Sequence, residues 1–106
     1  MNGIELIAAE RKRQIEQEGW TAEHDDEHSR GEIAEAAACY AMPPEARLIR
    51  VEDETDVVTG ENTGVGMLLW PWGEGSFKPT PDDRVRELVK AGALIAAEID
   101  RLQRGA

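Results

Sequence analysis

The sequence contains little cysteine and no long apolar run, and each shortage excludes a class of protein. Cys39 is the only cysteine, so the chain cannot form an intramolecular disulfide, which fits a reducing compartment. No segment approaches the roughly 18 consecutive apolar residues of a membrane-spanning helix. The N-terminal stretch MNGIELIAAERKRQIEQEG also lacks the apolar core of a signal peptide. We therefore expect a cytoplasmic protein with no membrane partner.

Positive charge is also scarce. The chain has 12 lysines and arginines against 22 aspartates and glutamates, a formal net charge of −10. Such a chain repels nucleic acid polymers and anionic membranes at long range. A phosphate-bearing small molecule remains compatible, because divalent cations invert the local field. The length of 106 residues, with 41% hydrophobic and 32% charged, suits one globular domain over residues 1–106.

Two helices are predicted in the first half of the chain, separated by a polar loop over residues 19–29. Residues 4–18 carry apolar side chains at helical spacing, and Gly19 is placed to end that helix. The expected buried stripe comprises Ile4, Ile7, Ala8 and Ile15. Residues 29–42 are rich in alanine, which favours close packing against another helix. They open with Ser29 and Glu32, which together form a capping-box pattern.

A third helix is predicted over residues 81–104, with Thr80 as N-cap and Pro81 in the first position. Its expected buried face comprises Leu88, Ala91, Ile95, Ile99 and Leu102. The predicted fold is therefore all-α, a small bundle of three main helices. Because three short helices bury little surface, we expect a homo-oligomer, either a dimer or a tetramer.

The insertion over residues 45–79 has no regular pattern. It contains β-favourable stretches separated by glycine, asparagine and aspartate, which are compatible with a short hairpin. Its last part, WPWGEGSFKPTP, is typical of an ordered irregular loop that covers a site.

Glu32 and Glu35 are the first candidate metal ligands. Three residues apart on a helix, they share one face, and paired carboxylates suit a hard divalent cation. The capping box alone also explains Glu32. Glu35 has no such explanation, because a charge among buried alanines is normally paired or bound to a metal.

The third helix offers a partner for these carboxylates. Glu87, Lys90 and Glu98 share one stripe, but Glu87 and Glu98 are roughly 16 Å apart along the axis, too far to serve one metal centre. Glu87 lies near the helix start, close to the aromatic loop, and is the preferred ligand. Glu98 also fits a surface or interface charge.

The HDDEH segment has several open interpretations. His24 and His28 with Cys39 suggest zinc, although their spacing matches no common zinc pattern. Asp25 and Asp26 fit a solvated loop equally well, or one of these side chains reaches the carboxylates as a ligand, a proton acceptor or a phosphate contact.

The aromatic side chains could stack on a nucleobase or fill a small core. This set comprises Trp20, Trp70, Trp72 and Phe77. Lys78, Arg84 and Arg86 lie near the start of the third helix and are candidate phosphate contacts.

Three stretches taken together resemble one family. They are ERKRQIEQEGWTAEHDDEHSRGEIAEAAACYA, WPWGEGSFKPTPDDR and RELVKAGALIAAEIDRL. The combination is similar to the MazG-like dATP/dGTP diphosphohydrolase domains that are frequent in phages and prophages. The similarity covers residues 5–42 and 68–104 and leaves 43–67 as the variable part.

The resemblance implies the all-α nucleoside triphosphate pyrophosphatase fold and a Mg²⁺ site, with Mn²⁺ as a substitute. The E-x-x-E motif of that superfamily corresponds to Glu32 and Glu35. Its E-x-x-D motif corresponds to Glu87, with Lys90 where the superfamily has aspartate. One carboxylate is therefore missing, and Asp83, Asp26 or a histidine is expected to replace it.

The activity implied is Mg²⁺-dependent hydrolysis of dGTP- and dATP-type purine nucleotides between the α and β phosphates, giving a monophosphate and pyrophosphate. No side-chain nucleophile is needed, and Cys39 and Tyr40 are better explained as core residues. Two alternatives are a non-catalytic nucleotide-binding or protein-interaction module that retains the fold, and a plain helical oligomerisation domain.

Overall fold

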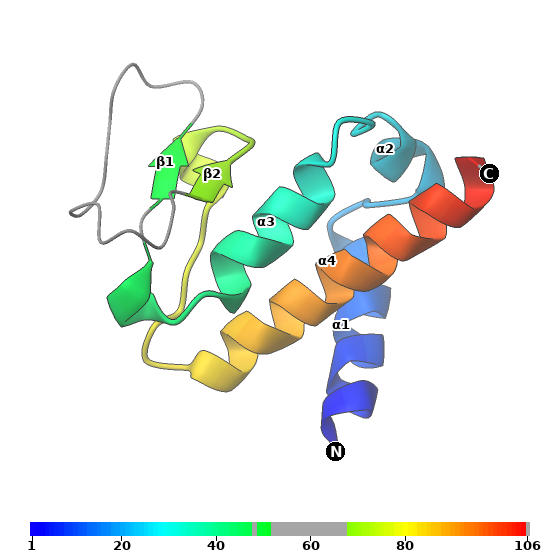
Figure 1. The fold of residues 1–106 in the computed structure, drawn as a ribbon. Coiled ribbons are helices and arrows are strands. Elements are labelled where there is room, and N and C mark those ends of the chain that lie inside the picture. Colours follow the sequence, from blue (N-terminus) through cyan, green and yellow to red (C-terminus); the bar gives the residue numbers. More distant parts are fainter. Residues whose placement is uncertain (48, 52–67, 106) are drawn as a thin grey trace.

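A computed structural model of the chain describes residues 1–47, 49–51 and 68–105 (Figure 1). The fold is mostly helical, which confirms the predicted all-α class. The four α-helices of this part are α1 (Gly3–Gln17), α2 (Ala22–Asp26), α3 (Glu32–Ala41) and α4 (Arg84–Gly105). The remaining elements are two short 3₁₀ turns, η1 (Pro44–Ala46) and η2 (Glu74–Ser76), and two strands, β1 (Ile49–Val51) and β2 (Leu68–Trp70). Among the described residues, no helix is long and apolar enough to cross a membrane.

Helix α4 is the centre of the fold. It runs antiparallel to α3, and α1 crosses it on another side (Figure 1). The crossing of α1 and α4 is close because Gly92 lacks a side chain. A Cβ atom at Gly92 would lie 2.5 Å from Cδ1 of Ile7. A side chain at position 92 would therefore require Ile7 to move.

The core lies between α3, α4 and the strand β2. The buried cluster comprises Ile33, Ala36, Ala37, Cys39, Tyr40, Trp70, Ala91, Leu94 and Ala97. The alanines on both helices bring their backbones together, so the predicted burial of the alanine-rich helix is confirmed. Burial raises the pKa of the Cys39 thiol to about 11, with a further rise from the charge of Glu35. Cys39 and Tyr40 are core residues, as expected.

The first helix follows its prediction at both ends. Asn2 and Glu5 form a capping box, in which each side chain accepts a hydrogen bond from the backbone N–H of the other at 2.9 Å. Gly19 adopts a positive φ of 74° after the last turn. This conformation lets the N–H of Trp20 donate to the Gln14 carbonyl at 3.0 Å.

The segment after Gly19 is more regular than predicted. Thr21 caps α2 by accepting a hydrogen bond from the His24 N–H at 3.4 Å. Part of the expected loop at residues 19–29 is therefore a short helix, whose signal was a threonine cap before AEHDD.

The predicted starts of the other two long helices are wrong. Helix α3 begins at Glu32 after Gly31, which has φ of 84°, and Ser29 makes no capping bond there. The Glu32 carboxylate instead accepts from the backbone N–H of Arg30. Helix α4 begins at Arg84, because Asp83 accepts from the Arg86 N–H at 3.1 Å, the bond of an N-cap.

Residues 80–83 form a turn before α4. The Asp83 N–H donates to the Thr80 carbonyl at 2.8 Å, and Pro81 lies inside this turn rather than at the first helical position. Thr80 and Asp83 are both residue types that cap helices well. Asp83 is the one that caps α4, so the helix begins at Arg84.

The strands β1 and β2 pair in parallel, with Ile49 opposite Leu68 and Val51 opposite Trp70. A hairpin requires antiparallel neighbours, so the hairpin interpretation is wrong for these two strands. The rest of that prediction falls on residues 52–67, outside the described residues.

The predicted buried stripes of α1 and α4 are wrong for most of their residues, although Ala91 is buried as expected. Ile4 is 82% exposed. On α4 the exposed side chains are Leu88, Ile95, Ile99 and Leu102, at 47%, 48%, 50% and 56%. The buried apolar residues of α4 are Val89, Ala91, Ala93, Leu94 and Ala97, of which the alanines let α3 approach closely. On α1 the buried residues are polar, Glu10 and Gln14.

Candidate functional site

The E-x-x-E carboxylates lie at the start of α3. Glu32 accepts from the Arg30 N–H and lies 3.3 Å from Nδ1 of His28. Partial burial would raise the pKa of Glu32, but these hydrogen bonds outweigh it and the pKa is lowered. Glu35 is half-buried one turn further along. The pair therefore has the shared face that the motif predicts, with Glu32 held ionised.

Glu87, the preferred third ligand, is a buried ion-pair centre. Its side chain is fully buried and accepts from Arg47 Nη2 at 3.0 Å, Arg84 Nη1 at 2.9 Å and the Thr80 N–H at 3.1 Å. Burial would raise the pKa of Glu87, but bonds from the two arginines lower it. Both carboxylate oxygens are occupied, so a cation could reach Glu87 only by displacing an arginine.

Asp83 and Arg84 also have structural contacts. Asp83 caps α4, as described above. Arg84 donates to the carbonyls of Tyr40, at 2.8 Å, and of Ala41 at the end of α3. These bonds tie the end of α3 to the start of α4.

Within the described part of the chain, no three His, Cys, Asp or Glu side chains gather as a metal site. Mg²⁺ commonly binds through one or two protein carboxylates together with substrate phosphates. Glu32 and Glu35 supply two carboxylates on one helix face, the number that this mode uses.

An aromatic and histidine pocket lies beside Glu32. It has a volume of about 270 Å³ and is lined by Trp20, His24, His28, Trp72 and Ser76. The Trp20 and His24 rings are parallel within 4°, with centroids 6.0 Å apart. His28 packs on Trp72 with centroids 5.0 Å apart. The walls of the pocket are thus flat rings, which suit a planar ligand.

His28 connects this pocket to Glu32. The same atom, Nδ1 of His28, lies 3.4 Å from the Trp72 Nε1–H and 3.3 Å from a Glu32 oxygen. Nδ1 can accept from Trp72 only without a proton and can donate to Glu32 only with one. The two bonds therefore exclude each other, and which one forms depends on whether Nδ1 or Nε2 carries the ring hydrogen.

Trp70 and Trp72 have different roles. Trp70 is 2% exposed and donates through Nε1 to Ser76 Oγ at 3.0 Å. It packs edge-on against Tyr40, with centroids 5.5 Å apart, and is a core residue that cannot stack on a ligand. Trp72 is half-buried and lines the pocket. Phe77 packs on the core beside Trp70.

The aspartates of the HDDEH segment pair with arginines. Asp25 is 2% exposed and accepts from Arg11 at 3.3 Å. Asp26 is bonded to Arg104 at 2.8 Å, near the end of α4. Because Asp25 is buried, the solvated-loop interpretation is wrong for it. Asp26 does not line the aromatic pocket, so the phosphate-contact interpretation has no support there. The zinc interpretation also lacks support, because Cys39 is in the core.

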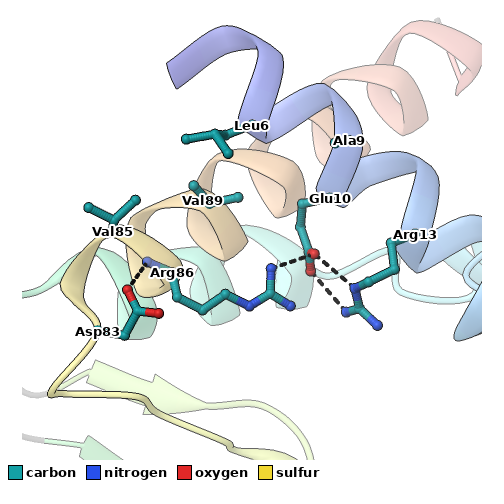
Figure 2. A pocket seen from close by; sticks show the side chains of 8 residues that line it. All are labelled: Leu6, Ala9, Glu10, Arg13, Asp83, Val85, Arg86 and Val89. Atoms are coloured by element: carbon teal, nitrogen blue, oxygen red, sulfur yellow. Dashed lines mark hydrogen bonds and ion pairs between the residues drawn. The ribbon is translucent and has the colours of Figure 1, made fainter. Parts of the chain in front are cut away.

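A second cluster was missed at the sequence level. Glu10 is 4% exposed and accepts from Arg13 on α1 and from Arg86 on α4 (Figure 2). Burial would raise the pKa of Glu10, but the hydrogen bonds and charges of these arginines lower it to about 2. The apolar spacing of α1 predicts burial of a different helix face. The one signal was Glu10, Arg13 and Gln14 at helical spacing.

Lys90 also faces this cluster. Its Nζ donates to the Lys78 carbonyl at 3.0 Å and lies 5.3 Å from the centre of the Tyr40 ring. Burial lowers the pKa of Lys90, and the positive charge of Arg86 lowers it further. Lys90 and Lys78 line a groove with Arg13 and Arg86.

Comparison of this chain with protein-family models, with curated proteins and with solved structures finds no match.

Proposed function

We propose that this protein is a Mg²⁺-dependent (deoxy)nucleoside triphosphate pyrophosphohydrolase that acts on dGTP- and dATP-type nucleotides. The observation that carries the proposal is the adjacency of two hollows. The aromatic pocket and the cationic groove share Trp20 and Ser76 as lining residues. A nucleotide has the same two parts, a flat base and a chain of anionic phosphates.

The aromatic pocket is the proposed site of the base. Trp20 and Trp72 would stack on a purine, while His24 and His28 offer ring nitrogens for hydrogen bonds to its edge. Stacking on aromatic side chains contributes about 1–3 kcal/mol per base in nucleic-acid proteins. The pocket thus favours large bases, which supports a purine preference.

Glu32 and Glu35 are the proposed ligands of a Mg²⁺ ion that enters with the triphosphate, with Mn²⁺ as a substitute. When bound, such an ion neutralises phosphate charge and polarises a water molecule. In the proposed hydrolysis, water would add to one phosphorus of the α–β anhydride, the bridging P–O bond would break, and a proton of the water would pass to solvent. The products are the monophosphate and pyrophosphate. Glu32, kept ionised by its hydrogen bonds, is suited to orient that water.

A specific observation favours the alternative, a nucleotide-binding module without turnover. Glu87 is held by Arg47 and Arg84, and Lys90 takes the place of a carboxylate. The site then has two metal-binding carboxylates in place of four. Such a protein would bind nucleotides and release them unchanged.

We further propose that a second copy of the chain covers the exposed face of α4. Leu88, Ile95 and Leu102 are spaced seven residues apart and are each about half exposed, which is the spacing of a helix–helix seam. The expected state is a dimer or tetramer. Sedimentation equilibrium of wild type and Ile95→Glu tests this, with a monomeric variant as the expected result. A monomeric wild type at 100 µM, a concentration about a hundredfold above a typical micromolar Kd, would rule the oligomer out.

Turnover separates the enzyme from the module. The purified protein is incubated with dGTP or dATP and Mg²⁺, and the products are separated by anion-exchange chromatography. The enzyme produces monophosphate and pyrophosphate in equal amounts. If nucleotides raise the melting temperature and no product forms with any common nucleotide, the module is correct. If the nucleotides are neither hydrolysed nor change the melting temperature of the protein, the result supports a plain oligomerisation domain.

A further inference from the structure

The groove beside the aromatic pocket has a charge opposite to that of the whole protein. It has a volume of about 340 Å³ and lies between α1, α4 and the loop before α4. Its charged lining consists of four cations, Arg13, Lys78, Arg86 and Lys90, against two carboxylates, Glu10 and Glu18. In a chain of net charge −10, such a surface is not expected by chance. It attracts anions where the rest of the molecule repels them.

Glu10 fixes the two arginines in place. Its Oε1 accepts from Arg13 Nε at 2.8 Å and from Arg86 Nη1 at 2.6 Å, and its Oε2 accepts from Arg13 Nη2 at 2.9 Å. Figure 2 shows the carboxylate between the two guanidinium groups. One buried negative charge thus holds two positive ones. The arginine side chains remain about one third exposed, at 32% and 34%.

Lys90 adds a third cation one turn after Arg86 on α4. It is half-buried, and its ammonium group is held by the Lys78 carbonyl, at 3.0 Å, and by the Tyr40 ring. These partners stabilise the position of the ammonium group without cancelling its charge. An anion in the groove would offset both the burial of Lys90 and its repulsion by Arg86.

Gln14 supplies an acceptor in the same lining. It is 2% exposed, and its Nε2 donates to Glu10 Oε2 at 3.1 Å, which fixes the orientation of the amide. No side chain or backbone group among the described residues donates to its buried Oε1. Leaving a buried acceptor without a donor costs free energy. A ligand that carries a hydroxyl hydrogen beside its negative charge would satisfy it.

We propose that this groove is a binding site for a phosphate-class oxyanion that carries one proton. Arg13, Arg86 and Lys90 bind the unprotonated oxygens, and the P–OH group donates to Gln14 Oε1. Sulfate has the same shape and no proton at neutral pH, so it leaves Gln14 unsatisfied. Free pyrophosphate retains a proton at neutral pH. That the anion is this product rests on the proposed function, whereas the anion site itself does not.

The test uses inorganic phosphate, with no nucleotide present. Titration calorimetry at low ionic strength compares phosphate and sulfate binding to wild type, Lys90→Met and Lys12→Met. Lys12 is an exposed α1 residue outside the groove, so its variant loses the same charge. Lys90→Met is expected to weaken phosphate binding about tenfold or more, as loss of one charged hydrogen bond does, and Lys12→Met to leave it nearly unchanged. Equal weakening by both variants, or no phosphate binding by wild type, overturns the site.

A second variant tests the acceptor. Gln14→Met keeps the charge of the groove, and its fold is checked by circular dichroism. Wild type should prefer phosphate to sulfate about tenfold, and Gln14→Met should bind both alike. Equal binding of the two anions by wild type contradicts the role of Gln14. A protein that binds phosphate in this way and does not hydrolyse nucleotides retains the anion site and loses only the proposed activity.

Discussion

Two buried glutamates in this protein each hold two arginines, and their surroundings differ. Glu87 is enclosed by Arg47, Arg84 and the Thr80 N–H, and the Arg47 side chain is only 8% exposed. Glu10 holds Arg13 and Arg86, whose side chains are 32% and 34% exposed, close to the 30% of Arg84, and border a groove. The same chemical group thus joins secondary structure elements in one place and presents cations to solvent in the other. The two clusters differ in Arg47, a buried arginine that has no counterpart around Glu10.

The largest effect on stability is expected from Glu87→Gln. It leaves Arg47 buried without its negative partner, which costs about 3–5 kcal/mol. Urea denaturation followed by circular dichroism measures the loss. Glu16→Gln, at an exposed position of α1, is the matched control and should change stability by less than about 0.5 kcal/mol. A Glu87→Gln variant as stable as this control would show that the enclosed pair is not structural.

Glu10→Gln is expected to cost less, about 2 kcal/mol. Arg13 and Arg86 can turn toward water when the negative charge is removed, because each is already about one third exposed. The same urea denaturation compares the two variants. If Glu10→Gln proves as costly as Glu87→Gln, the exposure of the arginines does not separate the two clusters.

Acid should weaken the protein through both clusters. The pKa of Glu10 falls from 4.5 to about 2 on folding because of Arg13 and Arg86. A lowered folded-state pKa means that this stabilisation is complete above pH 4.5 and is lost as the pH falls toward 2. Urea denaturation from pH 6 to pH 2.5 should therefore show a decline that is shallower in Glu10→Gln. Parallel curves for the two proteins would contradict the lowered pKa.

Glu32→Gln is expected to have the smallest effect on stability and a large one on activity. A glutamine oxygen still accepts from the Arg30 N–H, so the free energy of unfolding should change by less than about 0.5 kcal/mol. Loss of one proposed metal ligand should reduce nucleotide turnover about a hundredfold. The urea midpoint and the rate of pyrophosphate release are measured on one preparation. Unchanged turnover would mean that Glu32 serves only the start of α3.

The sequence predicted the fold class and the buried alanine-rich helix, because alanine spacing reports directly on close helix packing. It misassigned the faces of α1 and α4, since periodicity cannot tell a face that packs within the chain from one left exposed. Glu10 and Gln14 are buried on α1 while Ile4 is exposed, the reverse of the hydrophobic expectation. One partner of Glu87, Arg47, lies 40 residues away in the sequence, and no local pattern reveals such a contact.

The location of a bound nucleotide tests the central claim most directly. A crystal structure with a non-hydrolysable dGTP analogue and Mn²⁺ gives that location. The account predicts the base between Trp20 and Trp72, the metal on Glu32 and Glu35, and phosphate oxygens on Arg13, Arg86 and Lys90. A base outside the aromatic pocket, or phosphates bound away from the Glu10 cluster, would contradict it.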